Sequence, residues 1–184
     1  PRSSGNEKEV SDFLVQFAKD RNLEVYQDEI LNVIIKKPGT PGYENSEPLI
    51  IQGHMDMVCV KTDDSNHNFD TDPIEMIVEG DVLRANNTTL GGDDGIAVAY
   101  GLAILDADDI PHPPLELLVT TNEETGMDGA MELKADHLSG TRLLNLDTEV
   151  EGDFLVSCSG GSNIDLSFDI EREANSSKAY KLSI

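Results

Sequence analysis

The stretch Thr88-Thr89-Leu90-Gly91-Gly92-Asp93-Asp94-Gly95 decides how the rest of the chain is interpreted. Its paired glycines allow backbone conformations that a side chain would forbid. Residues 96–105 follow it and are apolar on all sides, which predicts a buried helix. Two carboxylates at the entrance of a buried helix are costly unless they meet a cation. An aspartate that caps the helix is the commoner arrangement, but a cap needs only one carboxylate.

Three other apolar runs of strand length end in polar residues. Residues 49–56 end in His54-Met55-Asp56, residues 115–124 end in Glu123-Glu124, and residues 143–147 end in Asp147. In open α/β sheets, sites form at the carboxyl ends of the strands. One histidine with aspartate and glutamate side chains is a suitable ligand set for divalent zinc, cobalt or manganese. The four motifs therefore predict a metal site.

Each motif alone has a simpler interpretation. His54 would be a hydrogen-bonded histidine at a strand end, and Glu123-Glu124 would be a solvated acidic loop. Alternation in an extended segment puts residues i and i+2 on one face, so Asp56 can fix the tautomer of His54. In an extended segment Glu123 and Glu124 would point to opposite sides. One of them could then bind metal while the other faces the substrate. The motifs together favour metal binding.

The order of these motifs resembles the two-metal exopeptidase family that includes aminoacylases, carboxypeptidases and dipeptidases. Within it, the details resemble the aminoacyl-histidine (Xaa-His, β-alanyl-histidine) dipeptidases. The matching phrases are residues 53–58 (GHMDMV), 88–91 (TTLG) and 123–130 (EETGMDGA), and Asp147 with its acidic followers Glu149 and Glu151. Gly95 stands where most of the wider family has lysine, which favours this branch over the aminoacylases.

The resemblance implies two divalent ions, zinc with cobalt or manganese as alternatives, and a role for six residues. The metal ligands are Asp93, which bridges both ions, His54 and Asp147 on the first ion, and Glu124 on the second. Glu123 is the general base and then the general acid, and Asp56 orients His54. The resemblance also implies a cis peptide bond between Asp93 and Asp94.

The implied reaction is metal-dependent hydrolysis of dipeptides with a C-terminal histidine, including β-alanyl-histidine. The alternatives are an aminoacylase or tripeptidase of the same family, and a non-catalytic acidic metal-binding domain. The intact Glu123 argues against a non-catalytic domain, because a structural metal site has no need of a base.

The expected fold is an α/β domain, a mixed open sheet flanked by helices. Residues 1–178 are expected to be the N-terminal part of a metallopeptidase catalytic domain, and 179–184 the start of a connection into a lid domain absent from the chain. The resemblance implies that the second ion takes a histidine from beyond that lid. His67, His112 and His137 match no motif; His67 is expected to be solvated and His112 to be structural or exposed. This chain alone should therefore be inactive, hold at most one ion tightly and expose an apolar sheet edge. A homodimer would form through the lid domain.

Composition excludes some partners. The net charge of −23 argues against binding nucleic acids or anionic membranes, and no stretch is long enough to span a membrane. Cys59 and Cys158 are expected to be buried, reduced residues, as in a cytoplasmic protein. The remaining patterns predict helices at 6–22 and 127–133, strands at 23–26, 32–35, 153–158, 163–170 and 179–184, and a hairpin of 75–78 with 82–85.

Overall fold

The computed structural model of the chain describes residues 2–148, 150, 152–158, 160–161, 164–169, 171 and 180. Two compact units, Pro1–Glu151 and Gly152–Ile184, divide the chain. All helices and strands of the described residues lie in the first unit. The first element along the chain is α1 (Lys8–Asp20), which nearly matches the helix predicted at 6–22.

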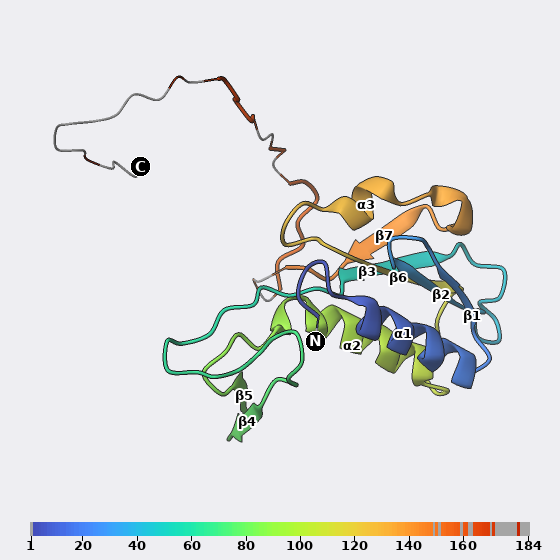
Figure 1. Ribbon diagram of the computed structural model, residues 1–184. Coiled ribbons are helices and arrows are strands. Elements are labelled where there is room, and N and C mark those ends of the chain that lie inside the picture. Colours follow the sequence, from blue (N-terminus) through green and yellow to red (C-terminus); the bar gives the residue numbers. More distant parts are fainter. Residues whose placement is uncertain are drawn as a thin grey trace. The chain divides into compact units, whose positions relative to one another are not determined.

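A five-stranded sheet forms the centre of the first unit (Figure 1). Its order is β1-β2-β6-β3-β7, in which β1 and β2 are antiparallel to their neighbours and β3 is parallel to β6 and β7. The mixed open sheet confirms the predicted fold class. The strands are β1 (Glu24–Gln27), β2 (Val33–Lys37), β3 (Leu49–His54), β6 (Leu115–Thr120) and β7 (Arg142–Asn145).

Helices cover both faces of this sheet. Figure 1 shows α1 and α2 (Gly92–Asp106) on one face and α3 (Asp128–Glu132), followed by a 3₁₀ turn at Ala135–His137, on the other. Alternate side chains of the strands point to opposite faces and form two apolar clusters. The cluster under α1 and α2 is the larger and includes Leu14, Ala18, Val33, Ile35, Ile51, Leu105, Leu117 and Val119. The other contains Ile34, Ile50 and Leu118, with Leu133 and Leu138 packed against it.

The helix α2 is buried on one side only, so the expectation of a helix buried all round is wrong. Ala97 and Leu105 face the sheet, whereas Ile96 is 49% exposed and Tyr100 is 56% exposed. The physical reason is that only one face of this helix meets the sheet. It packs there closely, because a Cβ added at Gly101 would overlap the Leu117 side chain.

The strand β7 is at one edge of the sheet, and its four residues are exposed, Leu143 and Leu144 among them. An exposed apolar sheet edge was expected. The predicted hairpin is also present, as a separate two-stranded sheet of β4 (Met76–Glu79) and β5 (Val82–Ala85).

The described residues of the second unit form neither of the strands predicted at 153–158 and 163–170. Residues 153–158 and 164–169 are irregular and exposed, and strands need a partner and a buried face to be stable. The strand predicted at 179–184 lies outside the described residues, apart from Tyr180. The cysteines also differ from expectation: Cys59 is half-buried and Cys158 exposed, although both are free thiols. No helix in the described part of the chain has the length and apolar character needed to cross a bilayer.

Candidate active site

The predicted site residues come together at one edge of the sheet. The parallel strands β3, β6 and β7 all have their carboxyl ends there. His54 is the last residue of β3, the Glu123–Glu124 turn follows β6, and Asp147 follows β7. The connection from β3 to β6 runs through α2 on one face, and that from β6 to β7 runs through α3 on the other. Ligands of open α/β sheets bind at such a crevice.

The His54 imidazole is buried, with a carboxylate at each ring nitrogen. Its Nδ1 lies 3.1 Å from the carbonyl oxygen of Asp56 and 3.3 Å from the Asp56 carboxylate. Its Nε2 lies 2.9 Å from Oδ1 of Asp93. The ring therefore directs Nε2 toward the start of α2 and Nδ1 toward the loop after β3.

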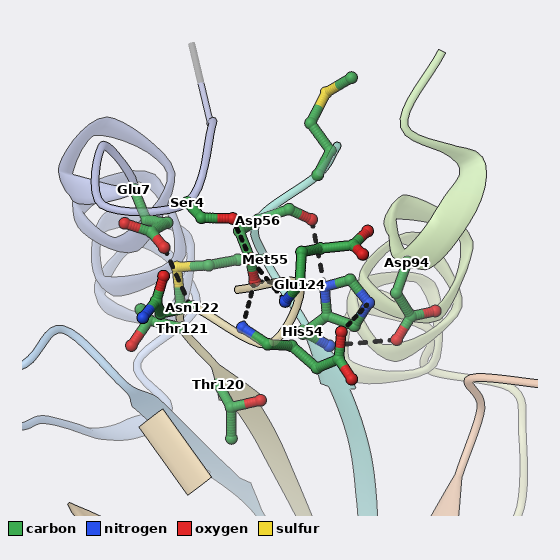
Figure 2. Close-up of polar contacts among 12 residues, drawn as sticks. Ser4, Glu7, His54, Met55, Asp56, Asp94, Thr120, Thr121, Asn122 and Glu124 are labelled. Carbon is green, nitrogen blue, oxygen red and sulfur yellow. Dashed lines mark hydrogen bonds and ion pairs between the residues drawn. The ribbon is translucent and has the colours of Figure 1, made fainter. Parts of the chain in front are cut away.

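Asp56 is fully buried and its carboxylate has further donors. The Ser4 hydroxyl donates to Oδ2 at 2.7 Å, and the backbone N–H groups of Glu123 and Glu124 donate at 3.1 and 3.2 Å (Figure 2). Burial alone would raise the pKa of Asp56, but the contacts with His54, Ser4 and the two N–H groups lower it to about 2. Asp56 is thus an ionised carboxylate that joins the β3 loop to the Glu123–Glu124 turn.

The described residues contain three groups of side chains whose ligand atoms lie within 4.8 Å of one another. The two groups that include a histidine both use the same one, His54. The groups are His54 with Glu123 and Asp147, His54 with Asp93 and Glu124, and Asp93 with Asp94 and Asp147. All four predicted ligands and Glu123 occur among these groups. The groups share residues, and none of them is the ligand set that the resemblance implies for either ion. An imidazole nitrogen among carboxylates suits zinc, cobalt or manganese, so the residues fit a metal site.

Glu123 and Glu124 do not lie in an extended segment, and they do not point to opposite sides of one. Residues 123–126 form a turn, entered through Asn122 with a positive φ of 53°. The N–H groups of the turn bond to Asp56, and both glutamate side chains reach the cluster. The reason is that β6 ends at Thr120, so both glutamates lie after the strand and do not follow its alternation of side chains.

Concentrated negative charge shifts the protonation of the cluster. Burial raises the pKa of Glu123, and the charge of Asp147 adds to this against the opposing effect of His54. Burial and the charge of Asp93 likewise raise the pKa of Glu124. Burial alone would lower the pKa of His54, but the neighbouring carboxylates, Asp56 first, raise it to about 9. The cluster is therefore more stable when its side chains hold protons or when its carboxylates share a bound cation.

The second aspartate of the organising stretch, Asp94, is the buried member of the third group. It is 1% exposed and accepts the backbone N–H of His54 at 3.1 Å. Burial raises its pKa to about 6. A Cβ added at Gly53 would lie 2.5 Å from its Oδ2, so a glycine is needed where α2 begins against β3. The peptide bond between Asp93 and Asp94 is cis, as predicted.

The remaining histidines lie outside the cluster. His112 is buried, with Nδ1 2.7 Å from the carbonyl oxygen of the next residue, which agrees with a structural role. His137 stacks on Tyr26. The expectation that His67 is solvated is wrong, because it is half-buried and packs edge-on against Phe69. Glu149 and Glu151, the acidic followers of Asp147, lie outside the described residues.

The sequence analysis missed the N-terminal segment. Arg2, Ser4 and Glu7 all contact loops of the site, Ser4 through Asp56 and Glu7 through the N–H of Asn122. No spacing or periodicity marks these residues, because their contacts reach more than 50 positions along the chain.

Comparison with known proteins identifies relatives over most of the chain. The sequence is 40% identical over 174 residues to the cytosol non-specific dipeptidase of Escherichia coli, which covers 95% of this chain and 36% of that protein. Among solved structures, the aminoacylhistidine dipeptidase of Vibrio alginolyticus matches with a TM-score of 0.80 at 43% identity, over 83% of this chain and 31% of that one. A tripeptidase from Staphylococcus aureus matches with a TM-score of 0.66 at 25% identity, over 81% of this chain and 40% of that one. No protein-family model matches the sequence. The chain thus spans about a third of the length of its two dipeptidase relatives.

Proposed function

We propose that this chain, which belongs to the same family as these dipeptidases, carries the metal centre of a peptidase that hydrolyses dipeptides. The observation that carries the proposal is the convergence of His54, Asp93, Glu123, Glu124 and Asp147 at the carboxyl ends of three parallel strands. Their sequence separation is large, and a packed core alone gives no reason to gather four carboxylates around one imidazole. Neighbouring carboxylates repel one another, whereas a shared cation stabilises them.

Two divalent ions, zinc in the first instance, would be held by four of these residues. Asp93 would bridge them, with His54 and Asp147 on one side and Glu124 on the other. Ions bound in this way lower the pKa of water and polarise a carbonyl oxygen. The close approach of His54 Nε2 to Asp93, at 2.9 Å, supports the choice of this nitrogen as the ligand atom.

Glu123 would move the protons of the reaction. Its carboxylate lies 3.9 Å from His54 Nε2, beside the ligands, and its side chain is about a third exposed, so that substrate can reach it. It would accept a proton from the attacking water and deliver it to the leaving amine. In the metal-free protein, burial raises the pKa of Glu123, which makes its carboxylate a stronger base.

Asp56 would keep His54 in the tautomer that binds metal. A neutral imidazole that ligates through Nε2 carries its proton on Nδ1, where a carboxylate or carbonyl accepts it. Asp56 supplies both kinds of acceptor to Nδ1, at 3.1 and 3.3 Å.

The substrate class that we propose is a dipeptide with a C-terminal histidine, including β-alanyl-histidine. The support is the 43% identity to an aminoacylhistidine dipeptidase. The non-specific dipeptidase relative and the more distant tripeptidase make a broader dipeptide range, or tripeptides, the alternatives. The name of the cytosol dipeptidase also supports a cytoplasmic location, and the homodimer through a lid domain stays a prediction.

A substrate panel tests the proposal. Protein expressed from its complete coding sequence would be freed of metal with a chelator and reloaded with zinc, cobalt or manganese. It would then be offered β-alanyl-histidine, other Xaa-His dipeptides, dipeptides without histidine, a tripeptide and N-acetyl amino acids. We expect metal-restored hydrolysis that is fastest for Xaa-His dipeptides. Preference for N-acetyl amino acids or tripeptides would favour the alternatives, and no hydrolysis with any metal would overturn the proposal.

A further inference from the structure

Residues 2–7 run beside the loop that follows β3 and contact three loops of the candidate site. Ser3 pairs with Met57 in a parallel bridge, and the Met57 N–H donates to the carbonyl oxygen of Arg2 at 3.0 Å. We propose that this N-terminal segment is a positioning element of the site, in which Ser4, Glu7 and Arg2 each hold a loop that carries a candidate ligand or the base. The inference rests on the proposed function for the roles of those loops.

Ser4 acts on the carboxylate of Asp56. One oxygen of that carboxylate faces His54 and the N–H of Glu123, and the other faces the Ser4 hydroxyl and the N–H of Glu124. The Ser4 contact, at 2.7 Å, is the shortest of these four. Without it, the second oxygen keeps only the longer bond to Glu124, and a buried carboxylate with an empty acceptor position rotates or recruits another donor. Rotation would disturb both His54 and the Glu123–Glu124 turn.

Glu7 holds the same turn from its other side. This side chain is 4% exposed, and its Oε1 accepts the backbone N–H of Asn122 at 3.0 Å (Figure 2). Asn122 directly precedes Glu123, and its positive φ redirects the chain out of β6. A buried glutamate is retained only with a partner, and here the partner is the peptide group that aims the proposed base.

Arg2 ties the β3 loop to the stretch before Asp93. Its guanidinium donates to the carbonyl oxygens of Met55, at 3.0 Å, and Asp56, at 3.2 Å, and also to that of Gly91. A Cβ at Gly95 would lie 2.8 Å from Nη2, so the glycines of the organising stretch leave space for this side chain. The planar fork of arginine serves several carbonyl oxygens at once, which the point charge of lysine does less well.

The three contacts share a feature that ordinary packing does not require. The Ser4 contact ends on the proposed orienter of His54, the Glu7 contact on the residue before the proposed base, and the Arg2 contact on Gly91, two residues before Asp93. Ser11 provides the comparison. It is fully buried, whereas Ser4 is half-buried, and it donates to the Leu31 carbonyl oxygen at 2.7 Å and accepts from Gln27 at 2.7 Å, but it touches no loop of the site.

The test compares Ser4→Ala with Ser11→Ala, two variants that each remove one hydrogen-bonded hydroxyl, half-buried at Ser4 and fully buried at Ser11. Zinc affinity would be measured by competition with a chromophoric chelator, together with kcat and KM for β-alanyl-histidine, in protein expressed from its complete coding sequence. Removing a group that orients a metal ligand typically costs ~10–100-fold in metal affinity or activity. We expect a loss of that size in zinc affinity and kcat for Ser4→Ala, with KM unchanged, and recovery in Ser4→Thr, which keeps the hydroxyl. Ser11→Ala should keep the original zinc affinity and kcat although it lowers stability.

Each outcome bears on a different claim. Equal zinc affinity and kcat in the original protein and Ser4→Ala would overturn the positioning role. Equal losses in Ser4→Ala and Ser11→Ala would also overturn it, because both would then follow from general destabilisation. Failure of the original protein to bind zinc would instead contradict the proposed function. Glu7→Gln offers a second test, with a drop in kcat at unchanged zinc affinity expected, since it acts on the turn of the base.

Discussion

The carboxylate of Asp56 lies 3.3 Å from Nδ1 of His54, while Nε2 of the same ring lies 2.9 Å from Asp93. The imidazole is therefore held between two acidic groups, one buried and one 56% exposed. The buried group fixes the ring, and the exposed one marks the side from which a cation can approach.

Substitution of Glu123 should separate catalysis from metal binding. In protein expressed from its complete coding sequence, Glu123→Gln keeps the shape of the side chain but cannot accept a proton, so we expect kcat to fall by ~10²–10⁴-fold. Metal content, measured by mass spectrometry of the metal, should stay nearly unchanged. Glu132→Gln, on the exposed side of α3, is the control and should keep full activity. Near-normal turnover in Glu123→Gln would show that Glu123 is not the general base.

Substitution of Asp93, unlike that of Glu123, should lower the metal content of the protein. Asp93→Ala removes the ligand proposed to be shared by both ions, so we expect metal content and activity to fall together. Asp109→Ala, an exposed aspartate in the loop after α2, should bind metal normally. Equilibrium dialysis against zinc measures both variants. Full metal content in Asp93→Ala would show that the bridge lies elsewhere.

Stability of the metal-free protein should depend on the proton of His54. The folded-state pKa of about 9 lies above the ordinary value of 6.5, so the proton stabilises the fold fully below pH 6.5. That contribution is lost as pH rises through 9. We expect Tm in the presence of a chelator to fall between pH 6.5 and 9, and the fall to be smaller in His54→Gln. The same fall in both proteins would assign it to other groups.

Away from the site, Glu116 should be a determinant of stability. This side chain is 2% exposed and accepts hydrogen bonds from the N–H groups of Ser139, at 2.9 Å, and Gly140, at 2.9 Å. It also forms an ion pair with Lys36 at 3.4 Å. Glu116→Gln turns an amide toward these donors and should lower the free energy of unfolding by ~1–3 kcal/mol. Urea denaturation measures the loss. Glu24→Gln, an exposed partner of the same lysine, should change stability little, and equal effects would contradict the argument.

Sequence reasoning predicted the parts of the fold that depend on local pattern. The helix near 8–20, the strands around Ile35 and Ile51 and the 76–85 hairpin follow from periodicity and turn residues, and the structure contains them. The candidate ligands were identified by motif order, and parallel pairing of β3, β6 and β7 explains why they meet.

The features that sequence reasoning missed depend on tertiary contacts. Exposure of Ile96 depends on what packs against α2, and the direction of Glu123 depends on where β6 ends. The contacts of Ser4 and Glu7 with the site are hydrogen bonds across 52 and 115 positions, respectively, which no local pattern encodes. A strand at 163–170 was predicted from alternation, but its described residues, 164–169, have no pairing partner in the described part of the chain.

The central claim is that His54 anchors a metal site in this chain. Both histidine-containing groups of described residues need the same imidazole, so only one of them can be complete at a time. The direct measurement is the zinc stoichiometry of the 184-residue chain, determined by equilibrium dialysis with metal analysis, for the original sequence and for His54→Ala. We predict one tightly bound zinc ion per chain, lost in His54→Ala. No tight zinc in the original chain, or an equal amount in His54→Ala, would contradict the account.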